Sequence, residues 1–367
     1  MKLVIFGLSV SSSWGNGHAT LWRGLVRALA RRGHHVVFFE RDVPYYAAHR
    51  DLTELPGGRL RLYPDWVGVR AEARRELADA DVGMVTSYCP DGIAATELVL
   101  DAPVARVFYD LDTPVTLDRL AAGEPLPYIG PDGLRGFDLV LSYTGGEALR
   151  ALETQLGAPC ARPLYGSVDP DVHCPAGPVE AFRGDLSYLG TYAADRQPAL
   201  ERLLVDVARR CAERRFVIGG AQYPLDFPWA SNIYFVQHLP PADHRAFYAS
   251  SRLTLNVTRA AMARMGYCPS GRLFEAAACG APVVSDRWEG LEHFYTPGEE
   301  ILLADDADDV VAALDRSDEE LRRIARAARE RTLAQHTNDA RAAELEALLD
   351  ATATGGPASL ARPMVTA

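Results

Sequence analysis

Short apolar stretches alternate with longer amphipathic ones along the first 145 residues. The residues between the first two apolar stretches, 20–32, carry apolar side chains at helical spacing and stop before Gly33, which can close a helix. Strands that are apolar on both faces are typical of a parallel sheet covered by helices on both sides. The pattern therefore predicts βαβ units with strands at residues 3–6, 36–39, 82–86, 105–109 and 139–142.

A second series of the same kind follows, with strands predicted at residues 186–189, 216–219, 233–235, 253–256, 282–285 and 301–303. The stretch between the series, 161–178, is rich in Pro and Gly, which is typical of a linker. We therefore predict an α/β protein with two Rossmann-like, doubly wound domains that face a central cleft. The expected parts are a first domain (1–165), a linker (166–178), a second domain (179–335), a C-terminal helix (336–350) and a tail without ordered structure (351–367).

Composition narrows the class of protein. With 367 residues, the chain is long enough for two domains of about 150 to 180 residues each. Its formal net charge of −11 argues against a general nucleic-acid or anionic-membrane surface, so any phosphate site must be local. Six cysteines without a C-x2-C pair suggest neither a zinc site nor a disulfide framework, and we expect a cytoplasmic protein. The first ten residues are interpreted as a core strand, and we expect no transmembrane segment.

The stretch 266–286 is the strongest candidate for a ligand site. Ser270 can cap a helix that begins near Arg272, and Gly280 can end it before a short buried strand. Free N–H groups at a helix start favour an anion, and a carboxylate one turn further can accept hydrogen bonds from two neighbouring hydroxyls, as a ribose presents. Glu275 is therefore our ribose candidate, and the alternative is an ordinary helix with Glu275 solvated.

Three loops at the ends of predicted strands contain further candidate ligand-binding or catalytic residues. In the first, 11–20, Gly15 and Gly17 allow close backbone approach, and His18 before the helix can position a phosphate, act as a base, or simply cap or pack. In the second, 108–117, Asp110 and Asp112 can bind hydroxyls or cap a helix. They lack the further ligands that a metal needs, so no metal site is expected there.

The third loop, 189–197, places Gly190 after a strand and Arg196 near the next helix start. An arginine there can contact a diphosphate with two N–H groups, and the alternative is a solvated side chain that balances Asp195.

Taken together, these loops resemble those of GT-B glycosyltransferases of the CgeB type (spore maturation protein B-like). The resemblance runs from about residue 1 to residue 345 and rests on WGNGHATLWRGLVRALARRGH (14–34), FYDLDTPVTL (108–117), LYGSVDPDVH (164–173), YLGTYAADRQP (188–198), LNVTRA (255–260) and PSGRLFEAAACGAPVVSD (269–286). It implies a GT-B fold in which the C-terminal domain holds a nucleotide diphosphate-sugar and the N-terminal domain holds the acceptor.

The resemblance also implies roles for single residues. Retaining GT-B enzymes usually have two glutamates eight positions apart; Glu275 matches the second, the ribose contact, and Cys268 replaces the first. In their G-R-x4-K pattern, which holds the diphosphate, the matching residues are Gly190, Thr191 and Arg196.

Gly17 matches the glycine of the family's first loop. His18 also coincides with the catalytic histidine of inverting GT-B enzymes, so stereochemistry stays open. We expect His18 and Asp110 to be catalytic. The expected donor-binding residues are Gly17, Gly190, Thr191, Arg196, His238, Ser270, Arg272 and Glu275.

The implied reaction moves a hexose-type sugar, most simply from a UDP-sugar, to a saccharide, small-molecule or protein acceptor. Because arginines and backbone N–H groups can stabilise the leaving diphosphate, we expect neither an obligatory metal nor a cofactor beyond the nucleotide-sugar substrate. Two alternatives use the same fold: a nucleotide-sugar epimerase and a non-catalytic nucleotide-sugar or carbohydrate-binding protein. A dinucleotide oxidoreductase fits least, because the G-x-G-x-x-G turn is missing.

Overall fold

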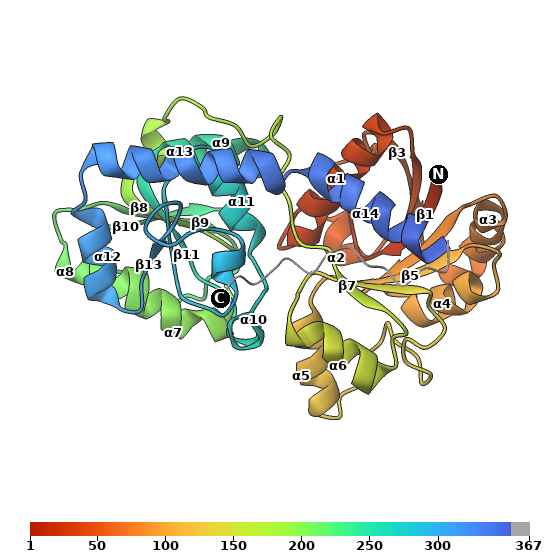
Figure 1. Cartoon of the computed structure of the whole chain (residues 1–367). Coiled ribbons are helices and arrows are strands. Elements are labelled where there is room, and N and C mark those ends of the chain that lie inside the picture. Colours follow the sequence, from red (N-terminus) through yellow and green to blue (C-terminus); the bar gives the residue numbers. More distant parts are fainter. Residues whose placement is uncertain (354–367) are drawn as a thin grey trace.

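The computed structural model of the protein describes residues 1–353. Two α/β lobes lie side by side, each built on one parallel sheet (Figure 1). The N-terminal lobe consists of β1 (Lys2–Gly7), α1 (Gly17–Arg31), β2 (His35–Arg41), α2 (Pro44–Ala47), β3 (Gly58–Tyr63), α3 (Trp66–Ala78), β4 (Val82–Thr86), α4 (Gly92–Leu100), β5 (Ala105–Asp110), α5 (Thr113–Ala121), β6 (Leu139–Ser142), α6 (Glu147–Leu156) and β7 (Ala161–Pro163).

The strands of this lobe are ordered β3-β2-β1-β4-β5-β6-β7. Successive side chains of a strand point to opposite faces, so Leu3 and Ile5 of β1 pack with α1 on one face while Val4 and Phe6 pack with α3 and α4 on the other. Both faces are buried, which confirms the sheet class that the apolar runs predict.

The sequence analysis did not predict the two edge strands, β3 and β7. In β3 the residues alternate between arginine and apolar side chains, so no continuous apolar run marks this strand. β7 is only three residues long and falls in the stretch that Pro and Gly suggested as linker, but it pairs with β6. Pro163 is tolerated there because an edge strand needs fewer ladder hydrogen bonds.

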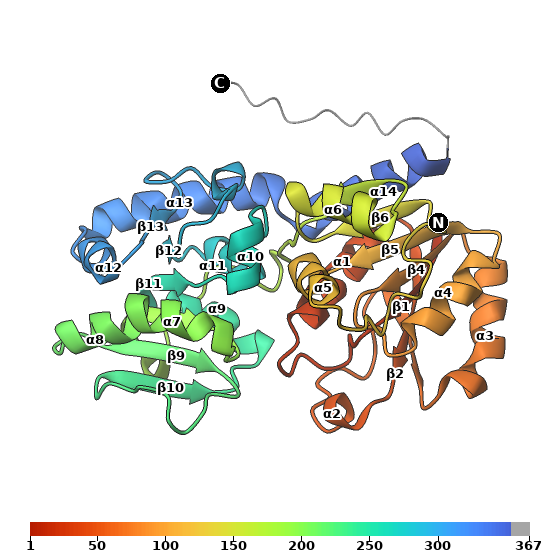
Figure 2. The same ribbon diagram turned by 90° about the horizontal axis from the view of Figure 1, so that it is seen from below.

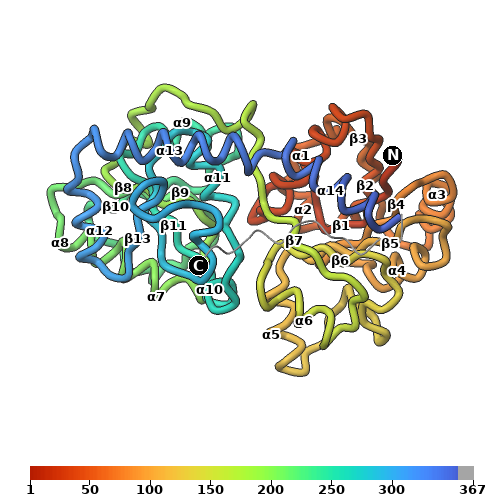
Figure 3. Tube along the Cα trace, viewed as in Figure 1, coloured from red at the N-terminus to blue at the C-terminus, as the bar shows by residue number. Residues whose placement is uncertain are grey.

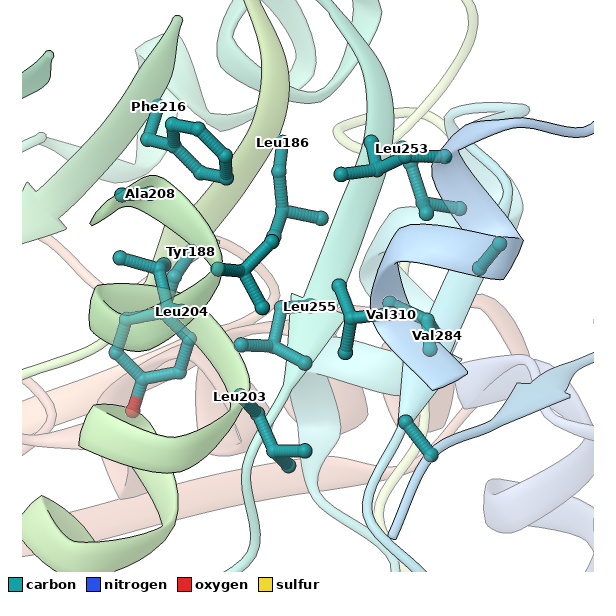
Figure 4. Close-up of a cluster of buried hydrophobic side chains, with 14 of the residues drawn as sticks. Leu186, Tyr188, Leu203, Leu204, Ala208, Phe216, Leu253, Leu255, Val284 and Val310 are labelled. Atoms are coloured by element: carbon teal, nitrogen blue, oxygen red, sulfur yellow. The ribbon is translucent and has the colours of Figure 1, made fainter. Parts of the chain in front are cut away.

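The C-terminal lobe has the strand order β10-β9-β8-β11-β12-β13. Its strands are β8 (Gly184–Leu189), β9 (Phe216–Gly220), β10 (Ile233–Gln237), β11 (Ser251–Asn256), β12 (Val283–Ser285) and β13 (Leu302–Leu303). Its helices are α7 (Gln197–Leu200), α8 (Asp206–Arg210), α9 (His244–Ala249), α10 (Ala260–Met265), α11 (Gly271–Ala278), α12 (Ala307–Leu314) and α13 (Asp318–Gln335). Figure 4 shows the core on one face of this sheet, where Leu186, Leu255 and Leu204 meet Val310 of α12.

The last helix, α14 (Asn338–Ala353), returns to the N-terminal lobe (Figures 2 and 3). Leu345 and Leu349 join the core beneath α1. Gly24 of α1 makes the close approach possible, because a Cβ there would lie 1.8 Å from Asn338 Nδ2. α14 also includes residues 351–353, the first three of the expected tail. The rest of the expected tail, 354–367, lies outside the described residues.

Candidate functional site

The carboxyl ends of the strands in both sheets face one cavity of about 550 Å³ between the lobes. Residues from both lobes line it. The cavity brings together every expected site residue except one: Gly17 and His18 from the N-terminal lobe, and Gly190, Thr191, Arg196, His238, Ser270, Arg272 and Glu275 from the C-terminal lobe. The exception is Asp110.

The first loop is fixed from beneath by a buried carboxylate. Glu40, at the end of β2, accepts hydrogen bonds from the backbone N–H groups of Val10 (2.7 Å) and Ser11 (2.9 Å) and from the hydroxyls of Ser9 and Ser11. Asn16 then caps α1 by accepting from the His18 N–H group at 3.1 Å. The helix therefore begins at Gly17, three residues earlier than the periodicity predicted, and His18 lies inside its first turn.

His18 forms a pair with Asp112 across the lobe. The Nε2 atom of His18 lies 3.0 Å from Asp112 Oδ2, and both residues line the cavity. Asp112 stands at the start of α5 but makes no capping hydrogen bond with its side chain. Its carboxylate therefore orients the imidazole, a role that the sequence analysis did not consider.

Asp110, the second residue expected to be catalytic, does not lie at the cavity. Its side chain is fully buried at the end of β5 and does not line the cavity. Burial raises the pKa of Asp110 to about 6, and the Asp112 carboxylate acts in the same direction. Asp110 is the last residue of β5, whereas Asp112 lies beyond the strand as the residue before α5, and only Asp112 lines the cavity.

On the opposite wall, α11 has the predicted cap. Ser270 accepts a hydrogen bond from the Arg272 N–H group at 3.3 Å, and Gly280 follows the helix with a φ of +78°. The Arg272 guanidinium donates to Asn256 Oδ1 at 2.9 Å and to the carbonyl of Leu189, and it lies 5.0 Å from the ring centre of Tyr188. These contacts hold a positive charge at the end of β8.

Arg196 lies beside this charge and is not the solvated side chain of the alternative interpretation. It donates to the Tyr188 hydroxyl at 3.1 Å, while its Nε atom is buried without a partner. Asp195 pairs with Arg259 instead, at 3.3 Å. Arg196 therefore keeps donor capacity for an anion in the cavity.

Glu275 is surrounded by two histidines and a tyrosine. His173 Nε2 lies 3.9 Å from Oε1, His244 Nδ1 lies 3.6 Å from Oε2, and the Tyr248 hydroxyl lies 3.5 Å from Oε2. Burial alone would raise the pKa of Glu275, but His173, His244 and Arg272 outweigh it and hold the pKa at about 2. The carboxylate is therefore ionised and able to accept hydrogen bonds.

Cys268, which stands where a second glutamate is common, also lines the cavity. Its thiol is the acceptor of a 3.1 Å contact from the Thr144 hydroxyl, and burial raises its pKa to about 12. A neutral thiol offers a sugar hydroxyl much weaker hydrogen bonding than a carboxylate would.

The lobes touch at the rim of the cavity. The ring of Trp14 stacks on His49 of the same lobe and also contacts His238 of the C-terminal lobe, with both ring centres 4.2 Å away. Gln222 donates to the Tyr45 hydroxyl at 2.8 Å. These contacts place the two walls of the site opposite one another.

Comparison with solved structures identifies this architecture. Sucrose-phosphate synthase from Thermosynechococcus elongatus matches with a TM-score of 0.70 at 16% identity, over 97% of this chain and 100% of that one. The chain has the GT-B fold. HepE from Anabaena in complex with UDP-glucose matches this GT-B chain with a TM-score of 0.66 at 13% identity, over 96% and 100% of the chains. The catalytic domain of starch synthase IV from Arabidopsis thaliana, bound to ADP and acarbose, matches with a TM-score of 0.65 at 12% identity, over 96% and 99%.

The sequence itself matches a family model in one region. Residues 196–347 of the GT-B chain match the family described as "Glycosyl transferase-like", a range that includes Arg196, Arg272 and Glu275. Comparison with curated protein sequences gives no significant match. Among the described residues, no helix is both long and apolar enough to cross a membrane.

Proposed function

We propose that this protein is a glycosyltransferase that moves a hexose-type sugar from a nucleotide diphosphate-sugar to an acceptor hydroxyl. One observation carries the proposal: a single cavity places the His18–Asp112 pair of one lobe opposite Arg196, Arg272 and Glu275 of the other. The match of residues 196–347 to a glycosyltransferase family model supports it. Neighbours of the same fold whose solved structures contain UDP, UDP-glucose or ADP favour a nucleotide donor, with a UDP-sugar first.

On the donor side, Glu275 would accept hydrogen bonds from the two ribose hydroxyls. Arg196, Arg272 and the N–H groups at the start of α11 would bind the diphosphate and stabilise the charge that develops as it leaves. Because these groups supply the charge stabilisation, the transfer itself would need no obligatory metal.

On the acceptor side, His18 would remove the proton from the attacking hydroxyl, with its imidazole oriented by Asp112. Base-assisted attack from the face opposite the diphosphate inverts the anomeric carbon. The proton coupling constant of the product's anomeric centre measures this outcome. We keep the CgeB-type assignment as part of the proposal, since WGNGHAT, LGTYAADRQ and PSGRLFEAA all contribute residues to the cavity.

The proposal is tested by titrating the full chain with UDP, GDP, dTDP, CDP and ADP in a chelator and following thermal stability. The best nucleotide should stabilise the wild type and the exposed control Glu292→Gln, but stabilise Glu275→Gln much less. The corresponding NDP-sugar should then be consumed in an acceptor-dependent manner. Conversion of the NDP-sugar alone to an epimer would support the epimerase instead, and binding without any turnover would support a non-catalytic binding protein.

A further inference from the structure

Three potential metal ligands meet at the donor wall of the cavity, where His244 and Glu275 line it and His173 is buried beside them. His173 comes from the segment that precedes β8, His244 begins α9, and Glu275 lies in α11. One ligand atom from each lies within 4.8 Å of those from the other two. The residues are 71 and 31 positions apart in sequence, so only the fold brings them together.

The histidines lack hydrogen-bond partners. His173 is 1% exposed, yet neither of its ring nitrogens has a partner, and Nδ1 of His244 is also buried without one. The closest approaches to Glu275, 3.9 Å and 3.6 Å, exceed hydrogen-bond length. Buried polar atoms are normally paired, and an unpaired one costs about 1 to 3 kcal/mol. Two of these atoms, Nε2 of His173 and Nδ1 of His244, face the Glu275 carboxylate without forming a hydrogen bond to it, as metal ligands would.

The position of His173 is fixed by its own segment. Its backbone N–H group donates to the Asp169 carbonyl at 2.8 Å. Asp169 is in turn held by Arg27 of α1, with Arg27 Nη2 2.7 Å from Asp169 Oδ2. The backbone at His173 is therefore held by contacts that do not involve Glu275.

We propose that His173, His244 and Glu275 bind a divalent transition-metal ion of the Zn²⁺ class, and that this ion competes with the nucleotide-sugar donor. Two imidazole nitrogens and one carboxylate are a common ligand set for zinc, with bonds of about 2.0 to 2.2 Å. Such bonds require ligand atoms about 3.3 Å apart, so the cluster must contract by an ångström or so. Hard cations such as Mg²⁺ prefer oxygen ligands and should not bind there.

The competition rests on the proposed function, in which Glu275 contacts the ribose. Each carboxylate oxygen of Glu275 faces one histidine, so an ion bound between them engages the acceptors that the ribose hydroxyls would use. The site is thus inhibitory, and the transfer reaction itself still needs no metal.

Direct binding provides the first test. Full-length protein, freed of metal by a chelator that is then removed, is titrated with Zn²⁺ and separately with Mg²⁺ by calorimetry. We expect one Zn²⁺ per chain and at least 10-fold weaker Mg²⁺ binding.

His173→Gln should lower the Zn²⁺ affinity at least 100-fold, whereas the exposed control His35→Gln should not change it. His244→Gln should act like His173→Gln and serves as the second variant if the first does not fold. Unchanged Zn²⁺ affinity in both variants, or no Zn²⁺ binding by the wild type, would overturn the proposal.

Competition is tested with UDP. At a saturating Zn²⁺ concentration, the apparent Kd for UDP should rise at least 10-fold in the wild type and stay constant in His173→Gln. An unchanged Kd in the wild type would overturn the competition. The metal site and the proposed function can fail separately. If the protein binds a nucleotide in chelator but does not bind Zn²⁺, only the metal site is overturned. If it binds Zn²⁺ but no nucleotide, the proposed function and the competition are overturned.

Discussion

His18 Nε2 lies 3.0 Å from Asp112 Oδ2, although the two residues are 94 positions apart in the chain. An ionised carboxylate can only accept a hydrogen bond, so this contact assigns the proton to Nε2 and leaves Nδ1 as the basic nitrogen. Nδ1 has no hydrogen-bond partner. The pair therefore keeps the imidazole in one orientation and one tautomer, as a general base requires.

Replacing Asp112 tests this relationship. Asp112→Asn should lower kcat by about 10²- to 10⁴-fold, because the amide no longer stabilises the imidazolium that forms when His18 takes a proton. The Kd for the nucleotide should change little, since Asp112 belongs to the opposite lobe. The rate of sugar transfer and calorimetric nucleotide binding measure the two effects. Asp101→Asn, at an exposed aspartate at the end of α4, is the matched control. If Asp112→Asn weakened nucleotide binding as much as it lowered kcat, the assignment would be contradicted.

Gly190 offers a test of the diphosphate site that leaves Arg272 in the chain. A Cβ at position 190 would lie 2.8 Å from both Arg272 Nη2 and the Tyr188 hydroxyl. Tyr188 is buried in the core, whereas the arginine side chain is flexible, so Gly190→Ala should keep the fold but displace the guanidinium. We expect the Kd for the nucleotide diphosphate to rise about 10-fold while the free energy of unfolding changes by about 1 kcal/mol or less. Calorimetry and chemical denaturation measure the two quantities.

The control for that variant is Gly177→Ala, where an added Cβ meets no atom within 4 Å. Its nucleotide affinity should match the wild type. If both variants bind the nucleotide as the wild type does, Arg272 does not contact the diphosphate.

Local patterns predicted the sheet class and the cap of α11 because both depend on neighbouring residues. Apolar runs predict strands buried on both faces, and Ser270 and Gly280 bracket a short helix whatever it packs against. Strand β3 escaped because its arginines alternate with apolar residues, as suits a sheet edge. α14 was predicted as a helix, but its return to the N-terminal lobe depends on tertiary contacts such as that between Gly24 and Asn338.

The candidate site was predictable only in part, for the same reason. His18 and Glu275 stood out through local spacing, and the structure places both at the cavity. Their partners could not be found locally: Asp112 reaches His18 only because β5 ends beside the first loop, and His173 and His244 reach Glu275 only through the fold of the C-terminal lobe. The choice between Asp110 and Asp112 likewise depends on which one faces the cavity.

Gly17 provides a test of close substrate approach. A Cβ there would meet no protein atom within 4 Å, and the residue lies in the first turn of α1. Gly17→Ala should therefore leave the protein as stable as before, or stabilise it by up to about 1 kcal/mol, since alanine is the better helix former. If the donor or acceptor contacts the backbone at this turn, kcat/KM should nevertheless fall at least 10-fold. Unchanged kcat/KM together with unchanged stability would show that the substrates stay clear of Gly17.

The buried His336 should make the protein sensitive to acid. Burial and the positive charge of Arg341 lower its pKa from the usual 6.5 to about 3. Arg341 donates to His336 Nδ1 at 3.1 Å, and an arginine cannot accept, so the folded protein needs the neutral imidazole. Above pH 6.5 the ring is neutral whether the chain is folded or not, and titration of His336 costs no stability.

Below pH 6.5 the unfolded chain binds a proton at His336 that the folded protein does not. Its contribution should reduce the free energy of unfolding by about 1.4 kcal/mol per pH unit as the pH falls toward 3. His336→Gln keeps an acceptor for Arg341 but cannot titrate, so its stability should fall less steeply between pH 6.5 and 5. Urea denaturation at several pH values compares the slopes, with His35→Gln as the exposed control. Parallel curves for the wild type and His336→Gln would show that acid destabilises the protein through other groups.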